Sequence, residues 1–162
     1  MHENGIFMNN NIDLNKFFDS LKNESDRGVV LLTASLLDKM LYKLFEVYLT
    51  LNEDLKESIL DNSLAPLNTF SNKIKMAHSL GLIDKKNYSN FEYIRKIRNK
   101  FSHDLYDISF ENKQIVDWCK NIDFPRISGS STNNYRYLFY DASFFLSGLI
   151  QGIISEKRKK DK

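Results

Sequence analysis

The sequence has little cysteine, proline and glycine. Its single cysteine, Cys119, excludes an internal disulfide, and no Cys/His cluster has the spacing of metal ligands. Two prolines and six glycines among 162 residues are few for a turn-rich β-fold and favour long helices. We therefore expect an all-α protein in a reducing, cytoplasmic setting, with no metal and no cofactor.

The sequence also lacks a large excess of charge of one sign. Its net charge is +2, whereas a protein that grips duplex DNA gains much of its affinity by neutralising phosphates. No short helix with base-reading side chains follows a tight turn, so direct DNA binding is disfavoured.

We also expect neither a signal peptide nor a membrane span. The first residues lack the basic region and apolar run of a signal peptide. The apolar stretch 138–154 is short for a membrane span and carries Asp141, so we expect a buried core or interface helix there and no membrane contact.

What is present indicates one helical domain. With 42% hydrophobic and 13% aromatic residues, the chain can bury a substantial core. Apolar periodicity and breaks at Pro66 and Gly81 predict helices at residues 13–23, 27–51, 53–60, 68–80, 84–102, 112–122 and 135–155. We expect a bundle over residues 12–155 in which the long 27–51 helix and the 84–102 helix are central. A flexible lead-in, residues 1–11, and a basic, mobile tail, residues 156–162, would flank it.

Some charged residues border the apolar faces of these helices. Arg27 and Asp38 lie beside the leucines of the 27–51 helix, and a charge next to a core usually has an internal partner. We assign Arg27, Asp38 and Lys73 structural roles in salt bridges or hydrogen bonds.

The end of the 84–102 helix gathers the side chains best suited to chemistry. Beside its apolar stripe stand a permanent cation, an amide, a hydroxyl and an imidazole: Arg98, Asn99, Ser102 and His103. This set suits metal-independent cleavage of RNA, with His103 as acid and base and Arg98 stabilising the phosphate. Asn99 and Ser102 would support them by hydrogen bonding.

The arrangement of this candidate catalytic pair depends on where the helix ends. Positions five apart on an ideal helix face different ways, so His103 reaches Arg98 only if the helix stops or loosens near Ser102. The alternative is structural: an arginine often lies along a core, and a histidine complements the dipole at a helix end. The spacing leaves both interpretations open.

Three further cations surround Arg98, namely Arg95, Lys96 and Lys100. Together with the nearby rings of Tyr93 and Phe101, they are compatible with single-stranded RNA, which is held by phosphate contacts and stacking. They are equally compatible with an acidic protein partner. We assign Arg95, Lys96 and Lys100 to substrate binding.

The last predicted helix bears on assembly. Gly148 and Gly152 share one face and would let another helix approach closely. The helix also carries more aromatic rings than one buried stripe needs: Tyr135, Tyr137, Phe139, Tyr140, Phe144 and Phe145. Because a second copy could cover some of them, we predict a homodimer.

Two resemblances to known families follow from these motifs. The segment Arg98-Asn99-Lys100-Phe101-Ser102-His103 looks like the Arg-polar-x-x-x-His signature of HEPN domains. A longer ordered pattern, over residues 27–110, resembles the mannitol operon repressor family. It consists of Arg27-Gly28, Ala34, Leu36-Leu37-Asp38, Leu41, Pro66-Leu67-x-x-Phe70-Ser71-x-Lys73-Ile74, Ala77, Leu80-Gly81-Leu82-Ile83 and Arg95-Lys96-Ile97-Arg98-Asn99-x-Phe101-Ser102-His103.

These resemblances imply an all-helical, HEPN-like bundle and two different functions. Resemblance to the repressor family implies a regulatory protein. Resemblance to catalytic HEPN domains implies an endoribonuclease, often a toxin or defence protein, whose Arg and His meet across a dimer. Some paired HEPN toxins carry a modified Tyr two residues after the His, whereas here Tyr106 is three residues after His103. The two hypotheses are a ribonuclease acting on RNA and a non-catalytic regulator acting through protein partners, with Arg98 and His103 then holding the fold or dimer.

Overall fold

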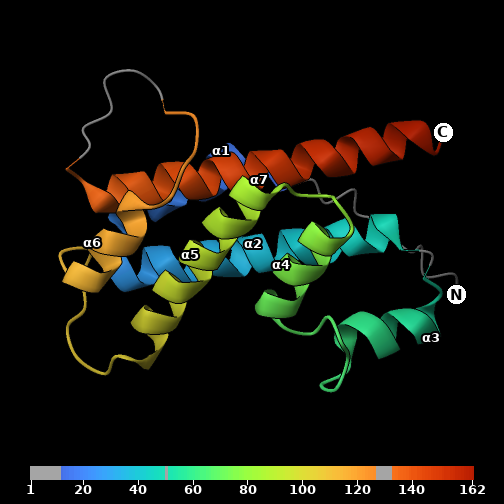
Figure 1. Cartoon of the computed structure of the whole chain (residues 1–162), viewed down its shortest axis with the longest axis horizontal. Helices are drawn as coiled ribbons and strands as arrows, with labels where there is room; N and C mark the ends of the chain where they lie inside the picture. The colour runs from blue at the N-terminus through green and yellow to red at the C-terminus, as the bar shows by residue number, and fades with distance from the viewer. Residues whose placement is uncertain (1–11, 50, 127–132) are drawn as a thin grey trace, which may run out of the picture.

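The chain folds as a helical bundle (Figure 1). A computed structural model describes residues 12–49, 51–126 and 133–162. These residues contain no strand and form α1 (Leu14–Ser20), α2 (Asp26–Tyr48), α3 (Glu53–Lys56), α4 (Phe70–Ser79), α5 (Lys85–His103), α6 (Lys113–Lys120) and α7 (Tyr135–Lys160). A 3₁₀ turn, Leu21–Asn23, follows α1, and a π-turn, Glu57–Asp61, follows α3. The predicted all-α class is confirmed.

Local capping chemistry sets where the helices begin. Each α-helix is preceded by a short polar residue whose side chain accepts a hydrogen bond from a backbone amide of the first turn, which satisfies a donor that the helix leaves free. These residues are Asp13, Ser25, Asn52, Thr69, Asp84, Asn112 and Asn134. After α4 the chain turns at Gly81, whose φ of 69° favours glycine.

Several predicted helix ends were wrong by two to five residues. The 27–51 helix ends at Tyr48, and the last helix does not stop at Ser155 but continues to Lys160. The expected mobile tail therefore forms helix over residues 156–160, since it contains no helix breaker and its cations complement the negative end of the dipole. Lys157 also pairs with Asp161 at 2.7 Å. The predicted lead-in, residues 1–11, lies outside the described residues.

Helix α2 is the centre of the bundle. It packs along α7 on one side and against α5 and α4, which cross it, on another (Figure 1). The 84–102 prediction corresponds to α5, but α7 covers more of α2 than α5 does. The core between these helices contains large side chains without solvent exposure, among them Leu37, Leu41, Phe45, Phe91, Ile94, Ile97, Phe101, Phe139, Leu146 and Ile150.

Helix α7 is long and apolar enough, by length and composition, to cross a membrane. The core helix of a soluble protein meets the same criterion. In α7, less than half of the most apolar 18-residue stretch is buried, and the buried side of this helix packs on α2.

An ion pair joins α2 to α4 inside the bundle. The Lys73 ammonium lies 2.7 Å from a carboxylate oxygen of Asp38, and the Lys73 side chain is only 5% exposed. Asp38 is 36% exposed and keeps contact with water. The pair therefore neutralises a cation that has almost no solvent of its own.

We predict that Asp38→Asn lowers the free energy of unfolding by about 2 kcal/mol, because it leaves the buried ammonium without a carboxylate. Lys73→Met should cost less, since it removes the buried charge and leaves Asp38 in water. Urea denaturation measures both, with the exposed Asp19 of the Lys22–Asp19 pair as a control site at which Asp19→Asn has little effect. Equal losses for the two α2–α4 variants would contradict this assignment.

Candidate functional site

Helix α5 presents the predicted site residues on its outer side. Its apolar stripe, which ends with Ile97 and Phe101, is completely buried against the bundle. The polar groups lie around the rest of the helix surface, with Arg98 at the edge of the stripe: Arg98, Ser102 and His103 are exposed, and Asn99 is half-buried.

The helix remains regular up to His103. The Asp104 amide donates to the Lys100 carbonyl at 3.1 Å, and the Ser102 hydroxyl donates to the Arg98 carbonyl at 2.9 Å. At about 100° per residue, Arg98 and His103 are then about 140° apart around the axis. The helix does not loosen near Ser102, so the condition under which His103 would swing back to Arg98 within one chain is not met.

The four candidate catalytic residues have different surroundings. The Arg98 guanidinium donates to the Asn99 side-chain oxygen at 3.0 Å, so these two neighbours contact each other. His103 is the last residue of α5, where a protonated imidazole would complement the helix dipole. Within the described part of the chain, no hydrogen bond joins Arg98 to His103.

The surrounding cations are partly neutralised by acidic neighbours. Arg95 makes two hydrogen bonds to Glu92, at 3.0 and 2.8 Å, and these hydrogen bonds raise the pKa of Arg95. Lys100 lies 3.9 Å from Asp104. Lys96 stays exposed, with its ammonium 5.4 Å from the ring centre of Tyr93. The surface is therefore less positive than the four cations alone predict.

Two consecutive residues of α2 fix the segment that leaves α5. Arg27 donates to the carbonyls of Asp104 and Tyr106 at 2.9 and 3.0 Å. Asp26 accepts from the amide of Phe110 at 3.1 Å. Residues 104–110 are thus held at both ends, and we call this segment the α5–α6 connection. Leu105 and Tyr106 within it are 89% and 83% exposed.

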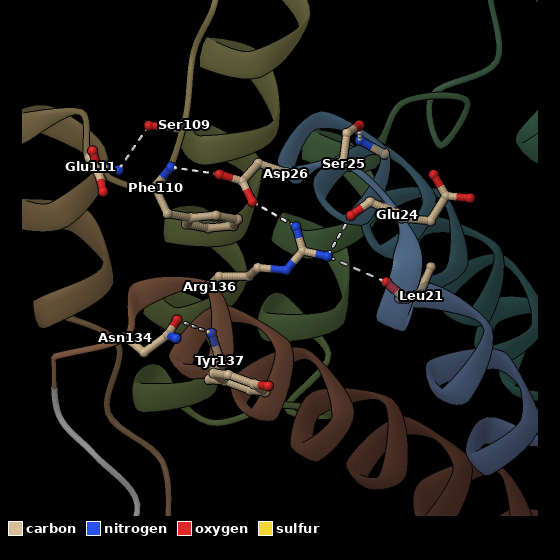
Figure 2. Close-up of polar contacts among 11 residues, drawn as sticks. Leu21, Glu24, Ser25, Asp26, Ser109, Phe110, Glu111, Asn134, Arg136 and Tyr137 are labelled. Atoms are coloured by element: carbon tan, nitrogen blue, oxygen red, sulfur yellow. Dashed lines mark hydrogen bonds and ion pairs between the residues drawn. The ribbon is translucent and has the colours of Figure 1, made fainter.

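Asp26 is also the partner of Arg136, and sequence reasoning missed this contact (Figure 2). The guanidinium of Arg136 lies 2.6 Å from a carboxylate oxygen of Asp26, and it donates to the carbonyls of Glu24 and Leu21 at 2.6 and 3.4 Å. This group joins the α1–α2 turn, the α5–α6 connection and the start of α7. The two charged residues are 110 positions apart, and no local pattern pairs them.

The described residues offer no metal site. No group of three or more His, Cys, Asp or Glu side chains among them lies close enough together to hold a metal ion. In the polar cluster of Figure 2, the Asp26 carboxylate and the Arg136 guanidinium bond to each other, to backbone carbonyls and to the Phe110 amide, an arrangement that joins segments of the chain.

Comparison with known proteins identifies the family. A model of the mannitol repressor family matches residues 15–137, from α1 to the first turn of α7. The chain belongs to the mannitol repressor family. No curated protein matches the chain.

Among solved structures, the chain is similar to one described as the X-ray structure of the MtlR–HPr complex from Escherichia coli. The TM-score is 0.58 at 19% identity, and the match covers 89% of this chain and 97% of that chain. At this identity the likeness shows a shared fold. The span matched by the mannitol repressor model includes the α5 residues and the Asp26–Arg136 pair, and it ends before most of α7.

We predict that Arg136→Met lowers the free energy of unfolding by about 3 kcal/mol, because it leaves the Asp26 carboxylate and two carbonyls without their donor in a half-buried site. Arg158→Met, on the exposed end of α7, is the matched control and should change stability little. Chemical denaturation followed by circular dichroism measures both. Equal stability of Arg136→Met and the unsubstituted chain would show that this cluster does not hold the bundle together.

Proposed function

We propose that this chain is a regulatory protein that acts through contacts with a partner protein and not through a DNA-binding domain of its own. Membership of the mannitol repressor family supports a regulatory role. The similar Escherichia coli structure is a complex of MtlR with another protein, HPr, which supports a protein partner. The near-neutral net charge adds to the case against a role as a duplex DNA binder.

The observation that carries the proposal is the rigidly held but exposed α5–α6 connection. Adjacent large side chains that are almost fully exposed on a fixed backbone provide contact area for another molecule, and tyrosine is enriched where proteins bind one another. Leu105 and Tyr106 are such side chains, and Arg27 fixes the backbone beside both of them. A surface that is already ordered loses little conformational entropy on binding, which favours affinity.

The side chains in and beside this connection indicate what kind of surface a partner would need. His103 and Arg98 lie on the last turns of α5, next to the connection, and both are exposed. Leu105 and Tyr106 lie between Asp104 and Asp107, with Arg98 on the preceding helix, and such a surface of mixed charge suits a partner with an apolar hollow and charged groups of both signs at its rim. We propose an HPr-type protein as this partner, by analogy with the similar complex.

The ribonuclease hypothesis requires Arg98 and His103 to act on the same phosphate. Because Arg98 and His103 do not meet within one chain, they would have to act on one phosphate from two copies. The exposure of both side chains is compatible with that arrangement, but Arg98 already contacts Asn99 and the neighbouring Arg95 is paired with Glu92. We therefore prefer the non-catalytic role for this site.

We predict that the purified chain leaves total RNA intact in EDTA, and that Arg98→Ala and His103→Ala do the same while remaining folded. Gel electrophoresis of the RNA and circular dichroism of each protein provide the readouts. Cleavage by the unsubstituted chain that is lost in both folded variants would establish the ribonuclease and exclude the non-catalytic assignment of Arg98 and His103.

We further predict that Tyr106→Ala combined with Leu105→Ser weakens binding of purified HPr from the organism that encodes this chain at least tenfold. The lost contact is an exposed aromatic and aliphatic anchor, and such anchors dominate interface energies. Leu64→Ser is the matched control, since Leu64 is 92% exposed and lies in the segment between α3 and α4. Titration calorimetry measures the affinities. Equal weakening by both substitutions, or binding unaffected by the first, would refute the assignment of this surface.

A further inference from the structure

Helix α7 has a face that the other described elements leave largely open, although the Phe144 ring on it packs edge-on against Phe18 of α1, with ring centres 5.2 Å apart. Seven exposed residues follow one another along it at spacings of three and four, so they form one line on the helix: Tyr137, Asp141, Phe144, Gly148, Gly152, Ser155 and Lys159. We call this line the open face of α7. It extends over about 33 Å at 1.5 Å per residue.

Part of the open face is an apolar groove. A hollow of about 420 Å³ lies between α7 and the segment that leads away from α6, with Phe124 and Pro125 on one side. Its α7 side consists of Asp141, Phe144, Phe145, Gly148 and Leu149. A Cβ atom placed on Gly148 or Gly152 would meet nothing within 4 Å, so another backbone can approach α7 closely at both positions.

The acidic residue of the open face lacks a partner. Asp141 stands among apolar groups, and burial raises the pKa of its carboxyl above the ordinary value. Within the described residues its carboxylate accepts no hydrogen bond and pairs with no cation. A molecule that covers this face must therefore supply a donor or a cation opposite Asp141.

The spacing of residues along the open face is the same in both directions from Gly148, so two copies of the face can pair in antiparallel orientation. When two such helices run antiparallel with Gly148 facing Gly148, residues whose numbers add to 296 face each other. Phe144 then faces the partner's Gly152, so the part of its ring that Phe18 leaves exposed fills the space beside a residue without a side chain. Asp141 faces the partner's Ser155, which can donate a hydrogen bond to it. Tyr137 faces the partner's Lys159, and this pair can form a cation–π contact.

We propose that a second copy of this chain covers the open face of α7, in an antiparallel, two-fold pairing centred on Gly148. Charge complementarity argues for this occupant: the acidic residue of the open face, Asp141, lies toward its N-terminal end, and the cation of the open face, Lys159, lies toward the other end. Antiparallel pairing brings the two ends together. Parallel pairing would place Phe144 on Phe144 and Asp141 near Asp141.

This pairing is independent of the proposed partner surface. The open face lies on α7, whereas the α5–α6 connection leaves the far end of α5 (Figure 1). A twofold-symmetric pair of chains would present two α5–α6 connections. Failure of either proposal therefore leaves the other unaffected.

Analytical ultracentrifugation of the full chain from 5 to 100 µM tests the pairing. We expect a dimer for the unsubstituted chain and a monomer for Gly148→Leu and for Gly152→Leu, because either leucine keeps the two helices apart. Both variants should melt at the same or a higher temperature at low concentration, since leucine favours an exposed helix position more than glycine does. A monomeric unsubstituted chain at 100 µM, or a dimer that survives both substitutions, would overturn the proposal.

Disulfide cross-linking tests the direction and centre of the pairing. Gly148→Cys should link to itself across the two-fold axis under mild oxidation, whereas Tyr137→Cys should not, because its neighbour is the partner's Lys159. Cys119 will not interfere: it is completely buried, and burial raises the pKa of its thiol to about 12. Linking of Tyr137→Cys as fast as Gly148→Cys would indicate parallel helices, and the absence of any Gly148→Cys link would exclude this centre; either result contradicts the proposal.

Discussion

The guanidinium of Arg136 holds together three parts of the chain that are far apart in the sequence. It bonds to the Asp26 carboxylate at the start of α2 and to carbonyls of the turn after α1. Asp26 in turn accepts the amide of Phe110, whose ring packs between those of Phe101 and Phe139 at 5.4 Å from each. One polar cluster therefore fixes where α1, the α5–α6 connection and α7 lie on α2, and this cluster lies directly beside packed aromatic rings. Because such a contact is bonded on all sides and only partly exposed to water, it specifies one arrangement of these segments.

Local signals in the sequence predicted much of the fold. Ser25, Thr69 and Asp84 begin helices by the capping chemistry expected of short polar residues, and Gly81 ends one by its positive φ. The stripe that contains Ile94, Ile97 and Phe101 faces the core as its spacing indicates. These features depend on neighbours within a few positions, so one sequence is enough to find them. The Asp26–Arg136 pair depends on how α2 and α7 pack, and no spacing along the chain encodes that.

At the candidate site, too, local features could be predicted from the sequence and contacts between distant segments could not. The residue types around Arg98 were evident in the sequence, but their chemistry depends on where α5 ends, and Arg27 on another helix holds the chain just beyond that end. The excess of positive charge was overestimated for a reason that was visible in the sequence: Glu92 is three positions before Arg95, and Asp104 is four positions after Lys100. Counting cations without their helical neighbours gave a surface suited to phosphates, whereas the structure leaves one with mixed charge.

The contacts that hold the α5–α6 connection have a consequence for how this protein can diverge. Arg27 and Asp26 bind only main-chain atoms of the connection: two carbonyls at one end and one amide at the other. The path of the backbone is therefore insensitive to which side chains lie at positions 105 and 106, and both point into solvent. Substitutions there can change what the surface recognises with little cost in folding stability. In this respect the connection resembles the variable loops of a binding scaffold, in which a constant frame carries residues that evolution is free to exchange.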